Sequence, residues 1–378
     1  MSKPFKIIII DTYYPKLLFA ICRKFAELGK ATYIEQRDFI MGQCFGTADF
    51  YSSNLKALGC EAEEIVVNSE VLQRQWAFEN GVKLNQSFLG RMVNKLPHSR
   101  KFFPNQDVLL NILAAQIKRA KPDVLYMQDL WFCPPSFLSD MKKYVKLLVG
   151  QIACPLPPKN HFSPYDLILS SLPHYVDKFR SWGIRSEFFK IGFEGNIARV
   201  LPKGDLKYEA VHIGGYGPLH LERNQLLEDV AKSIDIKFWG YGEDNLPSGS
   251  RIMRNYNGES WGIDRCRIFA QSKMVITKHI TTVAGKYCNN MTLYEATGCG
   301  ALLVTDYKDN LSELFVPDKE VVTYKTVEEA VNKIKYYLLH EEERKQIAAA
   351  GQKRTLDEHT YYNRMHELIN IISNYLRG

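Results

Sequence analysis

The sequence predicts an α/β protein built from two doubly wound parallel sheets, and three observations support this. Short apolar runs alternate with amphipathic stretches along the chain, which is typical of strands joined by crossover helices. The 378 residues exceed what one hydrophobic core usually accommodates, so two domains are expected. Residues 192–207 lose the periodicity and gather Gly, Pro and charge, which favours a domain boundary there.

The composition is ordinary for a soluble globular protein, with 46% hydrophobic and 24% charged residues. The formal net charge of +7 favours phosphorylated or anionic partners and does not by itself indicate nucleic acid binding. The eight cysteines show no Cys-x-x-Cys pair and no neighbouring histidine at zinc-ligand spacing. We therefore expect reduced thiols in a cytoplasmic protein and no metal site.

The first half begins with the apolar run 5–10, which predicts a buried central strand followed by a helix to about Leu28. This run is too short for a signal peptide or a membrane span. No Gly-x-Gly-x-x-Gly follows it, which argues against a dinucleotide-dependent oxidoreductase. Further strands of the same kind are expected at residues 65–67, 123–127, 145–149 and 166–169.

Polar residues follow two of these strands, at the sheet edge where doubly wound folds bind their ligands. Asp11 follows the first strand, and Gln128 and Asp129 follow the strand at 123–127. Asp129 has Trp131 beside it and could orient a hydroxyl or act as a general base. The alternative is that Asp129 only caps the next helix. Asp11, Gln128 and Asp129 are the candidate catalytic residues.

Residues 83–103 combine positive charge with aromatic rings. No Asp or Glu occurs between Lys83 and Lys101, and the segment contains Lys83, Phe88, Arg91, Lys95, Arg100, Lys101, Phe102 and Phe103. Such a segment could rest on an anionic membrane surface or hold a lipid-linked acceptor. The alternative is an ordinary solvated face.

The second half repeats the alternation of strands and helices. Strands are expected at residues 210–213, 234–239, 274–277, 301–304 and 321–324. Helices are expected at residues 261–270, 327–339, 341–351 and 359–376.

The stretch 289–306 organises this half. Thr292-x-x-Glu295 has the spacing of a helix capping box, and Asn289 or Asn290 could cap the same end one turn earlier. Gly298 and Gly300 predict a tight turn into the next strand. The helix start would direct free amides and a positive pole toward an anion such as a diphosphate, with Glu295 in reach of a hydroxyl on that anion. The alternative is a cap with no ligand.

Two further positions in this half suggest an anion site. The turn at 212–217 contains Gly214 and Gly215 and leads into the helix that carries Arg223. Glycines permit close backbone approach and Arg223 supplies a forked donor for phosphate oxygens, although a plain tight turn is the alternative. Lys278 follows the strand at 274–277, where a cation is better explained by a ligand than by a core.

Residues 293–306, followed by 311–315, resemble the Glu-Ala-x-x-x-Gly donor-site motif of GT-B glycosyltransferases, and look closest to the branch that includes the spore maturation protein CgeB. The similarity extends over 213–364 and is weaker at 45–51 and 122–128. It implies two Rossmann-like domains with a cleft between them: an acceptor domain at 1–195, a nucleotide-sugar domain at 209–357, and a C-terminal helix at 358–378 that crosses back to the first domain.

The resemblance also implies roles for individual residues. Glu295 would hold the ribose and Tyr241 would stack on the nucleobase. The diphosphate would be bound by the glycine turn, by cations and by the helix start, which comprise Gly214, Gly215, Arg223, Lys278, Asn289, Asn290, Met291 and Thr292. Many retaining enzymes of this fold carry two glutamates with seven residues between them, and the first of the two holds the sugar hydroxyls. Glu295 matches the second glutamate, and the position of the first is occupied by Tyr287 in this chain. The sugar and the stereochemical outcome are therefore unassigned.

We therefore predict a metal-independent glycosyltransferase without a separate cofactor, in which fixed dipoles and cations stabilise the leaving diphosphate. A UDP-sugar is the favoured donor, and a glycan, lipid-linked or protein molecule is the acceptor, as in cell-surface polysaccharide biosynthesis. The enzyme would be cytoplasmic, with peripheral membrane contact through residues 83–103. The alternatives are a sugar-nucleotide epimerase of the same fold and a non-catalytic sugar-nucleotide-binding or coat-assembly protein.

Overall fold

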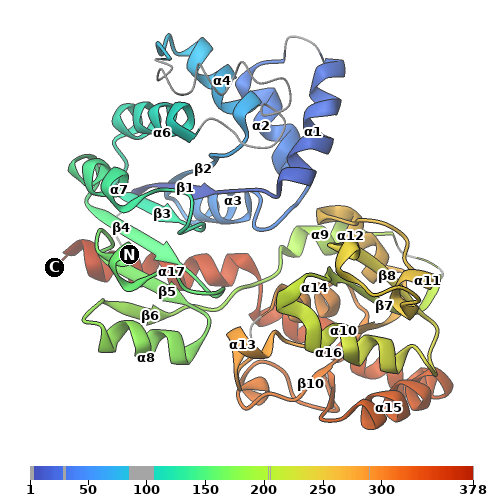
Figure 1. The fold of residues 1–378 in the computed structure, drawn as a ribbon. Coiled ribbons are helices and arrows are strands. Elements are labelled where there is room, and N and C mark those ends of the chain that lie inside the picture. The colour runs from blue at the N-terminus through green and yellow to red at the C-terminus, as the bar shows by residue number, and fades with distance from the viewer. Residues whose placement is uncertain are drawn as a thin grey trace. The chain divides into compact units, whose positions relative to one another are not determined.

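The computed structural model describes residues 4–28, 31–84, 106–202, 204, 206–288 and 290–377, which form two compact units. Unit 1 contains the described residues up to Ser170, together with His174–Phe188 and Met365 onward. Unit 2 contains Ser171–Pro173 and Phe189–Arg364. Most of unit 1 is blue to green in Figure 1, and most of unit 2 is yellow to red. The domain boundaries predicted from the sequence, at residues 1–195, 209–357 and 358–378, remain predictions.

Unit 1 is a parallel sheet whose strand order among the described residues is β2-β1-β3-β4-β5-β6. Strand β1 lies between β2 and β3 and contains four consecutive isoleucines that are fully buried, as expected where helices cover both faces of a sheet. Ile10 pairs with Ile65 on one side and Met127 on the other. The strands are β1 (Lys6–Asp11), β2 (Glu61–Val66), β3 (Val124–Met127), β4 (Leu147–Gln151), β5 (Leu167–Ser170) and β6 (Ser186–Phe188).

Helices lie on both faces of this sheet (Figure 1). Helix α2 begins at a capping box, because the Thr32 hydroxyl accepts the Glu35 N–H and the Glu35 carboxylate accepts the Thr32 N–H. The helices are α1 (Pro15–Leu28), α2 (Tyr33–Met41), α3 (Phe50–Ala57), α4 (Glu70–Glu79), α6 (Gln106–Ala120), α7 (Pro135–Met141), α8 (Pro173–Ser181) and α17 (Tyr361–Arg377). Of the predicted membrane segment, only Lys83 and Leu84 lie within the described residues.

Unit 2 is a second parallel sheet, with the order β11-β10-β9-β7-β8. Its strands are β7 (Tyr208–Gly215), β8 (Ile236–Tyr241), β9 (Ser272–Ile276), β10 (Leu302–Asp306) and β11 (Val322–Tyr324). Its helices are α9 (Gly195–Val200), α10 (Leu221–Val230), α11 (Arg251–Arg254), α12 (Gly262–Ala270), α13 (Thr281–Ala284), α14 (Met291–Gly298), α15 (Val327–Leu339) and α16 (Glu341–Glu358). One apolar core joins α10, α15 and α16 to the strands through Leu227, Ile334 and Ile347.

The predicted fold class, two doubly wound parallel sheets, is confirmed, but the extents of several elements differ from the prediction. Strand β6 was not predicted because its three residues alternate too briefly to give a pattern. Helix α16 continues to Glu358, whereas the sequence suggested an end at Gly351. A Cβ on Gly351 would lie 2.2 Å from the Glu320 carbonyl oxygen, so this glycine allows a close backbone approach and does not end the helix.

The chain enters and leaves unit 2 through two segments that pair with each other. Phe193 and Thr360 form a parallel bridge, in which the Phe193 N–H donates to the His359 carbonyl and the Tyr361 N–H donates to the Phe193 carbonyl, each at 2.9 Å. The guanidinium of Arg364, only 1% exposed, donates to the Ile191 carbonyl at 3.1 Å and to the Glu358 carbonyl at 3.0 Å. We call this arrangement the crossover clamp.

Candidate functional site

The two glycines predicted to face a ligand end strand β7, and polar side chains crowd them. A Cβ at either position would lie 2.9–3.2 Å from nitrogen or oxygen atoms, namely His212 Nε2 and Arg223 Nη2 at Gly214, and His220 Nε2 and the Tyr241 hydroxyl at Gly215. A Cβ on Gly240 in the neighbouring strand would meet the Gly214 carbonyl oxygen at 1.7 Å. Only glycines allow these side chains to converge on the turn.

Arg223 lies in the first turn of α10 and is 8% exposed. Its Nη2 donates to the Gly215 carbonyl, and its Nε is buried without a hydrogen-bond partner. Burial lowers the pKa of Arg223 to about 10, with the nearby charge of Arg265 acting in the same direction. The side chain therefore keeps its charge at neutral pH and has a donor to spare beside the glycine turn.

Two histidines that the sequence analysis did not select lie beside this arginine. His212 binds the Ile276 carbonyl through Nδ1 at 2.8 Å, and its Nε2 is buried without a partner. Burial, and then the charge of Arg223, hold the pKa of His212 well below its usual range and lower that of His220 to about 4. Both rings are therefore neutral at neutral pH, because burial and then the positive charge of Arg223 disfavour their protonated forms.

Of the starts predicted for helix α14, the structure has the asparagine cap and not the threonine capping box. Asn290 is the N-cap, since its side-chain oxygen accepts the Leu293 N–H at 2.9 Å. Thr292 lies inside the first turn and is not part of a capping box; its hydroxyl accepts a hydrogen bond from Arg265 Nη2 at 2.7 Å. Met291 is the first helical residue, and Asn289 lies outside the described residues. The helix start is thus formed by an Asn cap, which serves as well as a Thr box.

Glu295 makes an ion pair with Arg265 from α12, at 2.8 Å between Oε2 and Nη2. The two side chains are only 16% and 22% exposed, respectively, and Arg265 Nε is buried without a hydrogen-bond partner. The sequence analysis missed Arg265. The signal available was its position four residues before the buried Phe269, which places an arginine on the apolar face of an amphipathic helix.

Tyr241 ends strand β8 and stacks on Trp261, with ring centroids 5.2 Å apart and an interplanar angle of 22°. Both rings are partly exposed. One face of Tyr241 is therefore covered by the protein, and the pair forms a rigid aromatic surface.

Lys278 follows strand β9 and pairs with Glu222 from α10, at 3.0 Å between Nζ and Oε2. The next residue, His279, is 2% exposed and its Nδ1 lies 2.8 Å from Asp306 Oδ1. Burial acts to raise the pKa of Asp306, but the contacts with His279 and the charge of Lys308 lower it to about 2. A buried ionic group thus fixes the loop after β9 to the end of β10.

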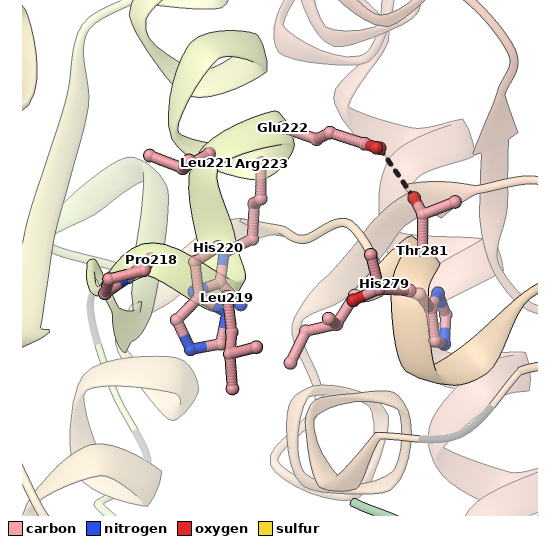
Figure 2. Close-up of a pocket in the computed structure, with 10 residues that line it drawn as sticks. Pro218, Leu219, His220, Leu221, Glu222, Arg223, His279 and Thr281 are labelled. Carbon is pink, nitrogen blue, oxygen red and sulfur yellow. Dashed lines mark hydrogen bonds between the residues drawn. The ribbon is translucent and has the colours of Figure 1, made fainter. Parts of the chain in front are cut away.

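A cavity of about 240 Å³ opens at this edge of the sheet, between the start of α10 and the loop after β9. Figure 2 shows Glu222 and Thr281 reaching toward each other from its two sides, with His220 on the α10 side. The residues that line the cavity are Pro218, Leu219, His220, Leu221, Glu222, Arg223, His279, Ile280, Thr281 and Thr282.

The three candidate catalytic residues of unit 1 lie at the ends of β1 and β3. Asp129 accepts hydrogen bonds from the Thr12 hydroxyl at 2.5 Å and from the backbone N–H groups of Trp131 and Phe132. It therefore stabilises the loop before α7 and does not cap that helix, which begins at Pro135. Gln128 accepts a hydrogen bond from the Thr47 hydroxyl at 2.8 Å through its side-chain oxygen.

Asp11 differs from Asp129 in its surroundings. The Thr12 N–H donates to its carboxylate at 2.8 Å. Burial raises the pKa of Asp11 to about 7; the Thr12 hydrogen bond opposes this shift and the charge of Asp129 adds to it. Asp11 is therefore suited to exchange a proton at neutral pH.

Within the described residues, no group of three or more His, Cys, Asp and Glu side chains has the arrangement of a metal site. None of the helices described is both long and apolar enough to cross a bilayer.

Residues 223–370 match the family model described as "Glycosyl transferase-like". Among curated proteins, none shows significant sequence similarity to the chain.

Solved glycosyltransferase structures match the whole chain. HepE of Anabaena, solved with UDP-glucose, has a TM-score of 0.61 at 12% identity, covering 98% of this chain and 100% of that chain. A glycosyltransferase from Rickettsia africae has a TM-score of 0.58 at 11% identity, covering 100% of both chains. AviGT4, involved in avilamycin A biosynthesis, has a TM-score of 0.55 at 13% identity, covering 99% of both. The chain therefore has the GT-B fold of these structures, as the sequence predicted, and residues 223–370 resemble a glycosyl transferase-like family.

Proposed function

We propose that this protein transfers a sugar from a nucleotide-diphosphate sugar, with a UDP-sugar favoured, to a glycan, lipid-linked or protein acceptor. The observation that carries the proposal is the glycine turn of unit 2, where Arg223, Arg265 and His212 each have a buried nitrogen without a hydrogen-bond partner. Buried polar groups in proteins are rarely left unpaired, so these atoms favour a polar ligand. Two guanidinium groups favour an anionic one.

The diphosphate is bound by Arg223, Arg265 and Lys278, together with the start of α14 at 289–292. These cations and the helix dipole neutralise the leaving diphosphate, which is why we propose that transfer needs no metal ion. Glu295 forms an ion pair with Arg265 through Oε2, which is buried and makes no hydrogen bond, so the carboxylate can still accept one from a ribose hydroxyl. The Tyr241–Trp261 surface stacks on the nucleobase.

UDP-sugars are favoured because HepE was solved with UDP-glucose, with UDP, and with UDP and glucose. A lipid-linked acceptor would bring the protein to the cytoplasmic membrane surface, which the basic and aromatic segment 83–103 would contact.

The acceptor is bound by unit 1, and Asp11 takes its proton. The pKa of Asp11, about 7, suits a general base at neutral pH. Asp129 positions Thr12 and the loop before α7, because three donors already occupy its oxygens. Gln128 uses its oxygen for Thr47, so its amide NH₂ is the group that would donate to an acceptor hydroxyl.

The test uses the full chain and isotope-labelled sugar nucleotides of uridine, guanosine, thymidine and cytidine. Transfer or slow hydrolysis supports a glycosyltransferase. An isomerised nucleotide would indicate an epimerase, and binding without turnover would indicate a non-catalytic binding protein. The variant Arg223→Gln is the negative control for the site. Failure to bind any of these nucleotides or their diphosphates would overturn the proposal.

A further inference from the structure

We infer that Glu222 binds the hydroxyl groups of the donor sugar and selects a neutral sugar over an acidic one; this rests on the proposed function. The cavity between α10 and the loop after β9 shares His220 and Arg223 with the proposed diphosphate site. A group attached to a diphosphate bound at the glycine turn would therefore enter this cavity.

The lining of the cavity combines apolar and polar groups, which match the apolar faces and the polar edge of a sugar ring. Leu219 and Ile280 offer apolar contacts for the C–H faces of a ring, and the hydroxyls of Thr281 and Thr282 offer hydrogen bonds for its edge. Arg223 and His279 are each more than nine-tenths buried, and each has a ring or guanidinium nitrogen without a partner. This lining is a built polar site and not a chance gap in the surface.

Glu222 is the acidic residue of this lining, and its neighbours hold it in place. Its Oε2 accepts hydrogen bonds from the Thr281 hydroxyl at 2.6 Å and from Lys278 at 3.0 Å, as Figure 2 shows for Thr281. These hydrogen bonds lower the pKa of Glu222, so the carboxylate is ionised and acts only as an acceptor. Among the described residues, no hydrogen bond or ion pair engages its Oε1.

A fixed carboxylate with one free oxygen beside a diphosphate has two consequences. It accepts hydrogen bonds from sugar hydroxyls, which are the only donors on a neutral hexose. It also repels a second negative charge, so a sugar that carries its own carboxylate, such as a hexuronic acid, is disfavoured. Glu222 thus sets both the affinity for the sugar and its charge class.

The experiment measures the affinities of UDP, UDP-glucose and UDP-glucuronate for the wild type and for Glu222→Gln by titration calorimetry on the full chain. If the wild type binds another nucleoside diphosphate instead, the same three ligands with that base are used. Because Glu222 also pairs with Lys278, the titration with UDP measures any effect of Glu222→Gln on the diphosphate alone, and the sugar preference is taken as the ratio of the UDP-glucose and UDP-glucuronate affinities. We expect the preference for the neutral sugar over the uronate to fall by about 10- to 100-fold, as for loss of a charge-assisted hydrogen bond.

The matched control is Asp229→Asn, which removes an acid from the last turn of the same helix, where it pairs with Lys232 at 2.6 Å. Glu222→Asp keeps the charge and shortens the side chain. It should therefore still discriminate against the uronate, while its affinity for the neutral sugar should be lower than that of the wild type. A wild type that binds the diphosphate, with an unchanged sugar preference in Glu222→Gln, would overturn the inference alone. A wild type that binds no nucleoside diphosphate would overturn the proposed function beneath it.

Discussion

The first strands of the two units end in sites of opposite charge. After β7 in unit 2, the glycine turn lies against Arg223 and neutral histidines; after β1 in unit 1, Asp11 lies beside Asp129. Burial acts on both, lowering the pKa of Arg223 to about 10 and raising that of Asp11 to about 7. The arginine stays charged at neutral pH while the aspartate becomes able to gain or lose a proton. One sheet architecture thus holds a buried cation in unit 2 and a carboxyl group of raised pKa in unit 1, on which the proposed anion and proton-transfer sites depend.

The largest effect is expected for Asp11→Asn, which tests whether the acid at the end of β1 transfers a proton. If Asp11 is the base, kcat should fall by about 10²- to 10⁴-fold while the affinity for the nucleotide sugar is unchanged. The wild-type rate should rise with pH through about 7, as Asp11 loses its proton, and that rise should be absent in the variant. Steady-state kinetics across pH provide the measurement.

The control for this variant is Asp140→Asn, which removes an exposed acid of unit 1 that is 71% exposed and pairs with Lys143. An equal loss in nucleotide-sugar affinity and in kcat for Asp11→Asn would show that the acid does not act in the proton-transfer step.

A smaller effect is expected from Arg265→Ala, which tests whether unit 2 depends on a cation contributed by α12. We expect about a 10-fold or greater loss in affinity for the nucleoside diphosphate, because a charge-assisted hydrogen bond is removed. Arg267→Ala is the matched control, since Arg267 lies on the same helix and pairs with the exposed Asp264.

A double-mutant cycle with Glu295→Ala separates two roles for Arg265. If Arg265 contacts phosphate, its removal should weaken diphosphate binding even when Glu295 is already absent. No further loss in that background would mean that Arg265 only positions Glu295.

The last prediction concerns stability and not activity. The pKa of Asp11 is about 7 in the folded chain against an ordinary 3.8, so its contribution to stability is complete below about pH 4 and is lost as pH rises through about 7. Asp11→Asn cannot ionise. The difference in free energy of unfolding, variant minus wild type, should therefore rise by on the order of 2 kcal/mol between about pH 5 and pH 8, after allowance for partial exposure of the side chain. Thermal melts of the variant and the wild type at both pH values test this. The same stability difference at both pH values would count against a raised pKa of Asp11.

The sequence predicted what depends on local pattern. Isoleucine runs identified the buried strand β1, and the glycine turn with Arg223 was visible because its members lie close together in the chain. Arg265 and Glu295 are 30 residues apart and meet only because α12 and α14 pack together, so no motif joins them. The choice of Asn290 over Thr292 as the cap could not be made either, since both residue types favour that position.

The crossover clamp determines how unit 2 would respond to tension. In a parallel bridge the incoming segment at Phe193 and the outgoing segment at Thr360 run in the same direction. Pulling the chain backward from the first and forward from the second would therefore slide the two segments past each other and would not peel them apart. Both backbone hydrogen bonds and the contacts of Arg364 would therefore bear the load together and would not break one after another.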